Sequence, residues 1–246
     1  MLSKAQNKYI RSLTHQKYRK LHNSFIVEGD KIVREWLNEK AAIQMVIALQ
    51  DWADQHNDLI SRHPETPLYI VKESELESLS ALQTPNQVML VVDIPAPQPV
   101  SANGWSIALD NIQDPGNMGT IIRIADWFGI KNIACSPDCV DVYNPKVVQS
   151  AMGGHLRVNT IKVDLNEFIS GAQVPVLAAT LDGENIYTLP KLNPGILIIG
   201  NESHGVSENL MKKASHKITV PRIGGAESLN AAVSTGIICA LLLKQC

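Results

Sequence analysis

Three segments of this chain combine an apolar, strand-like run with a loop of glycine, amide, hydroxyl and acidic residues. They are LDNIQDPGNMG (109–119), IIGNESHG (198–205) and VPRIGGAESLN (220–230). Glycine lets a backbone approach a ligand closely, and Arg123, in the helix expected after the first loop, could bind a phosphate or stabilise a developing negative charge. Open α/β sheets bind ligands at the carboxyl ends of their strands, so the three loops are predicted to converge on one site.

Several other chemistries lack their motifs. No G-x-G-x-x-G follows a strand and no G-x-x-x-x-G-K-[ST] occurs, so the usual phosphate cradles of dinucleotide and P-loop enzymes are missing. A G-x-S-x-G elbow, which α/β hydrolases use for acyl transfer, is missing too. Cys135 and Cys139 are four residues apart, but no second pair or nearby histidine completes a zinc site, so reduced thiols and no metal are expected.

The bulk composition is that of a soluble globular protein. The chain has 246 residues, a formal net charge of −2, 45% hydrophobic residues and 19% charged residues. No apolar run reaches the ~18 residues of a membrane span. The amino terminus lacks the apolar core of a signal peptide, which together with the cysteine usage predicts a cytoplasmic protein.

The charge is unevenly distributed, because residues 1–20 hold six Lys or Arg and no acid. A basic arm fits a polyanionic partner, since each phosphate contact releases counterions. The alternative, a solvated tail that favours helix, remains open from charge alone.

The sequence IPAPQPVSANG (94–104) reads as an extended linker that divides the chain into two domains, 1–97 and 98–246. In the first part, segments with helical spacing alternate with strand-like apolar runs, which predicts a small α/β domain. Its expected helices are 31–40, 51–61 and 73–82, and its expected strands are 43–49, 67–71 and 87–94.

The second part predicts a Rossmann-like α/β domain, because continuous apolar strands of this kind are buried on both faces in parallel sheets. Its expected strands are 105–110, 132–136, 174–180, 195–200 and 217–221. Four helices are expected: one after Pro115, one near 144–154, a short one from Ser207, and one spanning 228–243. The last helix is apolar nearly all round, which indicates burial in its own core or against a second copy.

The three polar segments closely resemble, in order and spacing, the three motifs of the SpoU family of RNA 2′-O-ribose methyltransferases in the SPOUT superfamily, whose members include TrmH-like enzymes. Asn117 and Arg123 match motif 1, Glu202 matches motif 2, and Ser228 and Asn230 match motif 3. The segment FIVEGDKIVREWL (25–37) resembles the start of the RNA substrate-binding domain that precedes the catalytic domain in many members.

The resemblance implies S-adenosylmethionine as methyl donor, RNA as acceptor and a ribose 2′-hydroxyl as nucleophile. It also implies a deep trefoil knot in the carboxyl-terminal part of the catalytic domain, and a homodimer whose interface completes the site. The two-domain layout favours ribosomal RNA over transfer RNA as substrate. The rival hypotheses are a non-catalytic RNA-binding protein on the same fold and a nucleotide-dependent oxidoreductase with a divergent loop.

The resemblance also carries over individual residues. The catalytic set is Arg123, Asn117, Glu202, Ser228 and Asn230. The donor-binding set is Thr180, Gly183, Gly200, Asn201, Gly205, Ile218, Val220 and Leu229. The family proposal makes Arg123 the proton acceptor, but a guanidinium is protonated in proteins, so phosphate binding and alkoxide stabilisation are the alternative role.

The residues themselves also have plain structural interpretations. Arg123 could be a surface arginine paired with Asp126, three residues on. Asn117 could cap its helix or contact RNA and the partner subunit, and Ser228 could cap the last helix. Glu202 could accept from nearby backbone N–H groups or pair with a cation, whereas the resemblance implies that it orders the site through Arg123.

Overall fold

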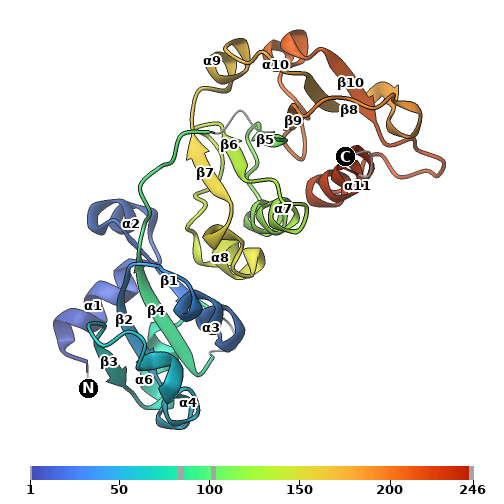
Figure 1. Ribbon diagram of the computed structural model, residues 1–246. Coiled ribbons are helices and arrows are strands. Elements are labelled where there is room, and N and C mark those ends of the chain that lie inside the picture. Colours follow the sequence, from blue (N-terminus) through green and yellow to red (C-terminus); the bar gives the residue numbers. More distant parts are fainter. Residues whose placement is uncertain (1, 83–85, 101–103, 244–246) are drawn as a thin grey trace. The chain divides into compact units, whose positions relative to one another are not determined.

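The computed structural model describes residues 2–82, 86–100 and 104–243. The chain forms two compact units (Figure 1). The first comprises Met1–Ala96 together with Asp141–Leu156, and the second comprises Pro97–Val140 together with Arg157–Cys246. Among the described residues, no helix is long and apolar enough to cross a membrane.

The first unit is built on a four-stranded sheet in the order β1-β4-β2-β3. β4 pairs antiparallel with β1 and β2, and β3 pairs parallel with β2. The strands are β1 (Ser24–Glu28), β2 (Ile43–Ala48), β3 (Leu68–Ile70) and β4 (Val88–Asp93). The helices are α1 (Lys4–Ser12), α2 (Gln16–His22), α3 (Asp30–Asn38), α4 (Gln50–Gln55), α5 (Asn57–Ile60), α6 (Glu73–Leu79) and α8 (Pro145–Ala151).

Both faces of this sheet are covered, because successive residues of a strand point to opposite faces. On β1, Phe25 and Val27 enter a core shared with α3, α4 and α8, whereas Ile26 enters a second core shared with α1 and α6. The strands therefore read as continuous apolar runs, and α1 and α6 lie in a different layer from α3.

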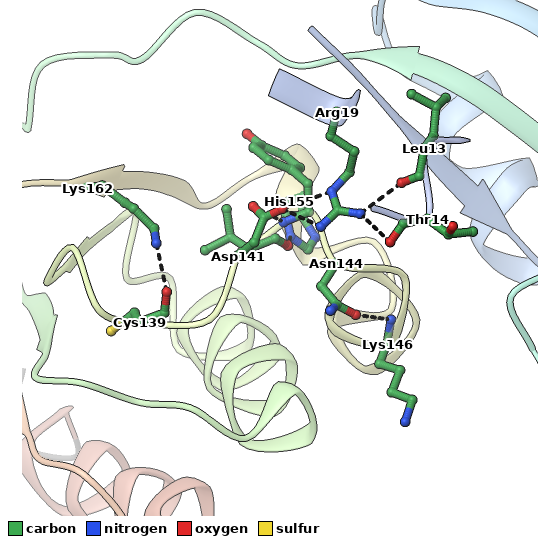
Figure 2. Close-up of polar contacts among 11 residues, drawn as sticks. Leu13, Thr14, Arg19, Cys139, Asp141, Asn144, Lys146, His155 and Lys162 are labelled. Carbon is green, nitrogen blue, oxygen red and sulfur yellow. Dashed lines mark hydrogen bonds and ion pairs between the residues drawn. The ribbon is translucent and has the colours of Figure 1, made fainter. Parts of the chain in front are cut away.

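A buried ion pair fixes the junction of α1 and α2 (Figure 2). The side chain of Arg19 is only 2% exposed, and its Nε donates to Asp141 Oδ2 at 2.8 Å. Its Nη1 donates to the carbonyl oxygens of Leu13 and Thr14, which lie just beyond the end of α1. The guanidinium thus satisfies carbonyls that the helix end leaves without an intrahelical donor, and it ties them to the segment that carries α8.

Replacing Asp141 with asparagine is expected to lower the free energy of unfolding by about 3 kcal/mol, because it leaves the buried guanidinium without its counter-charge. Chemical denaturation monitored by circular dichroism measures this. The matched control is Asp138→Asn, which changes an exposed carboxylate in the same stretch of chain. Equal stability of the two variants would show that the Arg19 contacts to carbonyl oxygens suffice.

The expected helix 51–61 is divided in the structure. α4 ends at Gln55 and α5 begins at Asn57, because His56 leaves helical geometry with φ −118° and ψ 25°. The ring of His56 stacks on Trp52 with centroids 4.4 Å apart. Helices α1 and α2 and strand β1 were not predicted as separate elements.

The second unit contains a six-stranded sheet in the order β10-β8-β9-β5-β6-β7, with every pairing parallel. The strands are β5 (Ser106–Leu109), β6 (Asn132–Cys135), β7 (Asn159–Lys162), β8 (Val176–Asn185), β9 (Ile196–Ile199) and β10 (His216–Thr219). The helices are α7 (Pro115–Trp127), α9 (Leu165–Ser170), α10 (Glu208–Lys213) and α11 (Ala231–Leu243). The predicted α/β class with a parallel sheet is confirmed, while β7 and α9 were missed.

Strand β8 is longer than predicted and irregular. Its pairing with β10 jumps from Ala178 opposite Lys217 to Glu184 opposite Ile218. Between these two pairs β8 has five residues, 179–183, and β10 has none, so that segment of β8 leaves the ladder as a bulge. That segment contains Thr180 and Gly183, two residues predicted to bind the donor.

Candidate active site

The three polar loops leave the same edge of the parallel sheet. They follow the carboxyl ends of β5, β9 and β10, so the predicted convergence is confirmed. From β5 the chain builds β6 and β7 on one side, and β8 to β10 lie on the other. The boundary between β5 and β9 is therefore the topological switch point, where α/β sheets form their ligand crevice.

A chain of side-chain hydrogen bonds joins the three motifs. Asn117 Nδ2 donates to Glu202 Oε1 at 2.9 Å, and Asn117 Oδ1 accepts from Asn230 Nδ2 at 2.7 Å. Glu202 also lies near the backbone N–H groups of Gln113 and Asp114, at 3.5 and 3.3 Å. Asn117 is buried, and both its amide nitrogen and its amide oxygen are hydrogen-bonded. It therefore fixes the position of Glu202 from motif 2 relative to Asn230 from motif 3.

Both predicted helix caps differ in the structure. Asp114 caps α7, with its Oδ1 accepting from Asn117 N at 2.8 Å, and Pro115 occupies the first helical position. Asn230 caps α11, since its Oδ1 accepts from Ala232 N at 2.9 Å. Ser228 lies exposed in the loop before it. Asp114 thus takes the capping place expected of Asn117, and Asn230 takes the one expected of Ser228. Asp-Pro before the apolar run was the signal for the first cap.

Arg123 lies exposed on α7. Asp126 is not its partner, because both oxygens of that carboxylate accept from Arg157 at 2.8 Å. Nor does Glu202 reach Arg123, since it accepts from Asn117 and backbone groups instead. Within the described ranges no hydrogen bond or ion pair joins Arg123 to another residue, so its guanidinium is available to an external anion.

Two glycines create close backbone contacts around the loops. A Cβ at Gly200 would lie 2.1 Å from Gly205 C, and a Cβ at Gly183 would lie 2.5 Å from Ile218 C. Distances below 3 Å exclude any side chain unless the backbone moves. Thr180, beside Gly183 in the bulge of β8, has a buried Oγ1 without a hydrogen-bond partner among the described residues.

The motif 2 loop is held from both sides. Asn201 Oδ1 accepts from the backbone N–H of Ser203, and its Nδ2 donates to Asn111 O at 2.7 Å. Asp110 Oδ2 accepts from Ser207 N at 2.7 Å. Asn111, in the left-handed region with φ 59°, was not singled out from the sequence, although Asn is the residue that tolerates such a backbone.

The remaining residues predicted to bind the donor occupy different environments. Ile218 is buried on β10, Val220 follows that strand, and Leu229 is exposed before α11. Gly205 has a positive φ of 69° at the end of the motif 2 turn. The structure thus brings the β8 bulge, β10 and the motif 2 loop to one edge, without joining Leu229 or Ser228 to them by a hydrogen bond that it describes.

Two buried thiols lie beneath the first loop. A hydrogen bond from Cys135 lowers the pKa of Cys139 to about 6, and the same interaction raises the pKa of Cys135 well above its ordinary value. Ser136 Oγ, between them in sequence, accepts from Asn111 N at 2.9 Å. Cys135, Cys139 and Cys239 are free, and the described residues contain no cluster suited to a metal ion.

Comparisons with known proteins identify the family of this chain. The model of the SpoU rRNA Methylase family matches residues 104–240, and that of the MRM3-like substrate binding domain matches residues 4–90. The 23S rRNA (guanosine(2553)-2′-O)-methyltransferase RlmP of Bacillus subtilis is 30% identical, over 94% of this chain and 97% of its own.

Solved structures give the same result. A protein from Porphyromonas gingivalis described within the TrmH family of RNA methyltransferases superimposes with a TM-score of 0.86 and 34% identity, covering 98% of each chain. An AdoMet-bound rRNA methyltransferase from Sinorhizobium meliloti gives 0.86 and 27%, covering 99% of this chain and 97% of that one.

The parallel sheet with its three joined loops, together with these relatives, defines an S-adenosylmethionine-dependent RNA methyltransferase. The chain belongs to the SpoU rRNA Methylase family, so the relationship indicated by the three motifs is confirmed.

Proposed function

We propose that this protein transfers a methyl group from S-adenosylmethionine to a ribose 2′-hydroxyl of ribosomal RNA, with the three-motif site as its catalytic centre. The hydrogen-bond chain from Asn230 through Asn117 to Glu202 carries this proposal. It fixes three loops at the switch point of the sheet. That arrangement suits a reaction in which the main task is to align two reactants, a contribution of ~7–11 kcal/mol in favourable cases.

The residues at the predicted donor site are suited to bind S-adenosylmethionine. The buried Oγ1 of Thr180, which has no partner among the described residues, offers a hydrogen bond. Gly183 and Gly200 let the backbone pack directly against Ile218 and Gly205, which brings the segments that border this site close together. Further contacts are proposed for Asn201, Gly205, Ile218, Val220 and Leu229. When bound, S-adenosylmethionine supplies a methyl group on a positively charged sulfur, which is already activated for transfer.

Arg123 is proposed to act at the RNA side of the reaction. Its guanidinium, which has no partner in the part of the chain that the structure describes, can bind the phosphate beside the target ribose and stabilise the oxygen as its proton leaves. Arginine side chains stay protonated in proteins, so electrostatic stabilisation fits their chemistry better than proton removal. Ser228 and Asn230 are proposed to place the substrate.

Ribosomal RNA is favoured over transfer RNA by the relatives. RlmP is named for 23S rRNA, and it aligns with nearly the whole of this chain. The match of residues 4–90 to a substrate binding domain supports an RNA-binding role for residues 1–97, with residues 98–246 as the catalytic domain. A cytoplasmic location is also proposed.

Transfer of labelled methyl groups to unmodified total RNA tests the substrate. Ribosomal RNA and transfer RNA are separated by size after the reaction, and intact ribosomal subunits are offered in parallel. Label in ribosomal RNA, free or within a subunit, is the expected result. Label confined to the transfer RNA fraction would refute the substrate, and absence of label from every fraction despite measured donor binding would refute the enzyme assignment.

We also propose that two copies of the chain form a homodimer and that the carboxyl-terminal part of the catalytic domain forms a trefoil knot. α11 packs on α7, yet both helices expose large apolar side chains, with Trp127 84% and Val233 51% exposed. Exposed apolar surface on adjacent helices is typical of an interface. The sequence left open whether α11 is buried in its own core or against a second copy, and its exposed side chains favour the second copy for one face.

Light scattering is expected to give twice the mass of one chain, and Val233→Glu is expected to give a single chain, because a charge on an apolar interface must be desolvated. Glu208→Gln, which changes an exposed charge on α10, should leave the dimer intact. A wild-type monomer with full activity would contradict a site that the partner completes.

A further inference from the structure

Helices α1 and α2 form a hollow whose walls are aromatic and basic. The hollow has a volume of ≈310 Å³ and is lined by Ala5, Lys8, Tyr9, Ser12, Tyr18 and His22. This volume lies in the range of small-ligand sites, about 300–1,000 Å³. All of these residues belong to the first unit.

The rings in this hollow are arranged around His22. The ring of Tyr9 meets His22 edge-on, with centroids 4.9 Å apart at 85°, and the ring of Tyr18 lies nearly parallel to it, 6.4 Å away at 15°. Tyr9 is held in place because its hydroxyl donates to Gln44 Oε1 at 2.7 Å. Tyr18 is 37% exposed, and its hydroxyl forms no hydrogen bond in the part of the chain that the structure describes. Exposed aromatic faces of this kind stack on unpaired bases.

Cations surround the rings. Lys4, Lys8 and Arg11 lie at helical spacing along one face of α1, and Lys17 Nζ lies 5.9 Å from the ring centroid of Tyr18. Lys20 is exposed on α2. Across the described ranges none of these five side chains forms an ion pair, so their charges are not neutralised locally. Cations interleaved with aromatic rings are the pattern of sites that bind single-stranded nucleic acid.

A second hollow lies on the α6 side of α1 and is less suited to an anion. It measures ≈490 Å³ and is lined by Lys4, Asn7, Lys8, Arg11 and Glu75. The carboxylate of Glu75 would repel a phosphate, whereas the aromatic hollow contains no acid. Lys8 borders both, so it can bind a phosphate while the attached base enters the aromatic side.

The junction between the two helices is rigid. Arg19 binds the carbonyl oxygens of Leu13 and Thr14 and the carboxylate of Asp141, which fixes where α2 leaves α1 (Figure 2). The walls of the hollow are therefore positioned before any ligand arrives, which lowers the entropic cost of binding.

We propose that this hollow binds one unpaired nucleotide of the RNA substrate, with its base against Tyr18 and His22 and its phosphate on Lys8. The inference rests on the proposed function, because it takes RNA as the substrate, and it adds the place on the first unit where that RNA is held. An unpaired nucleotide is required, since the bases of an A-form duplex are stacked on one another and present no free face.

Binding of a short, fluorescently labelled single-stranded oligoribonucleotide to the full-length protein tests this. Wild-type protein is expected to prefer the single strand over a duplex of the same sequence. Tyr18→Leu should weaken binding of the strand by about 5- to 150-fold, which corresponds to the ~1–3 kcal/mol of one stacked base. Tyr18→Phe keeps the ring and should bind like the wild type.

The charge contribution is measured by the dependence of affinity on salt. Lys8→Gln should reduce the slope of log affinity against log salt concentration by about 0.7, the value for one phosphate contact to a single strand. The matched control is Lys31→Gln, an exposed lysine on α3 in the layer across the sheet, which should leave the slope unchanged. Wild-type affinity in Tyr18→Leu, or equal slopes in Lys8→Gln and Lys31→Gln, would overturn the proposal.

Methyl transfer by the same variants separates this inference from the proposed function. Tyr18→Leu should raise KM for RNA with kcat and donor affinity unchanged. A wild-type enzyme that methylates RNA, combined with a Tyr18→Leu variant of wild-type KM and wild-type strand affinity, would refute the hollow alone. A wild type that methylates no RNA would refute the proposed function, and the oligonucleotide affinities would still decide whether the hollow binds a nucleotide.

Discussion

The Arg123→Ala variant is expected to lose methyl transfer by a factor of about 10²–10³ in kcat, the range observed when one electrostatic contact to a transition state is removed. The loss should fall on kcat, because the negative charge that the guanidinium stabilises develops only in the transition state. Before RNA is bound the guanidinium is exposed and has no hydrogen bond or ion pair within the described residues. For the same reason the thermal midpoint and the affinity for S-adenosylmethionine should stay at the wild-type values.

Two further variants test what the guanidinium does. Arg123→Lys keeps a charge but loses the two-pronged geometry, so an intermediate rate is expected if phosphate binding matters. Lys131→Gln removes an exposed charge shortly after α7 and should leave the rate unchanged. Near-normal turnover of Arg123→Ala would remove this residue from the mechanism.

The Asn117→Asp variant is expected to be both unstable and slow. It replaces the amide that donates to Glu202 at 2.9 Å by a second carboxylate, and it does so at a buried position. Loss of a satisfied buried donor should lower the free energy of unfolding by about 1–3 kcal/mol. The rate should fall by about 10²-fold, as expected when reacting groups are displaced by roughly 1 Å.

The instability of Asn117→Asp should depend on pH. Two adjacent carboxylates raise the folded-state pKa of one of them above its ordinary value of about 4. A group with a raised pKa in the folded state favours folding when it is protonated, so the deficit relative to wild type should be small near pH 4 and should grow as pH rises towards 7. Denaturation midpoints of both proteins across that range measure it.

A double-mutant cycle identifies the contact responsible. In Asn117→Asp/Glu202→Gln the glutamine amide can donate to the new aspartate, which restores one hydrogen bond across the same pair. The double variant should therefore be more stable than the sum of the two single changes predicts. Simple additivity would mean that the contact between Asn117 and Glu202 does not couple the two motifs.

Much of this site could be predicted from the sequence because the signals were local. Apolar strands followed by loops of glycine and amide residues indicated a parallel sheet with its site at the carboxyl edge, and the motif spacing indicated the family. The hydrogen-bond and ion-pair partners of individual residues were harder to predict from the sequence. Asp126 had an arginine three residues away, yet it pairs with Arg157, 31 residues away. The tertiary structure decides which of two possible partners a residue binds, and the local spacing of residues carries no information about it.

The helix caps and the β8 bulge were missed for similar reasons. Ser228 and Asn230 are both good capping residues, and the choice of Asn230 is linked to its bond with Asn117, 113 residues earlier. At the bulge in β8 the backbone of Gly183 lies close against Ile218, a contact that no pattern within the strand indicates. The segment with α8 was predicted as a helix, but its packing in the first unit depends on contacts such as that between Tyr143 and Phe25, whose ring centroids lie 4.6 Å apart.

The most direct test of the proposed reaction is the chemical position of the transferred methyl group. Ribosomal RNA labelled by the wild-type enzyme is digested with alkali, which cleaves every phosphodiester bond that follows a free 2′-hydroxyl. Label in alkali-resistant dinucleotides, present with wild type and lost with Arg123→Ala, is the predicted result. Label released in mononucleotides would place the methyl group on a base and contradict transfer to the ribose.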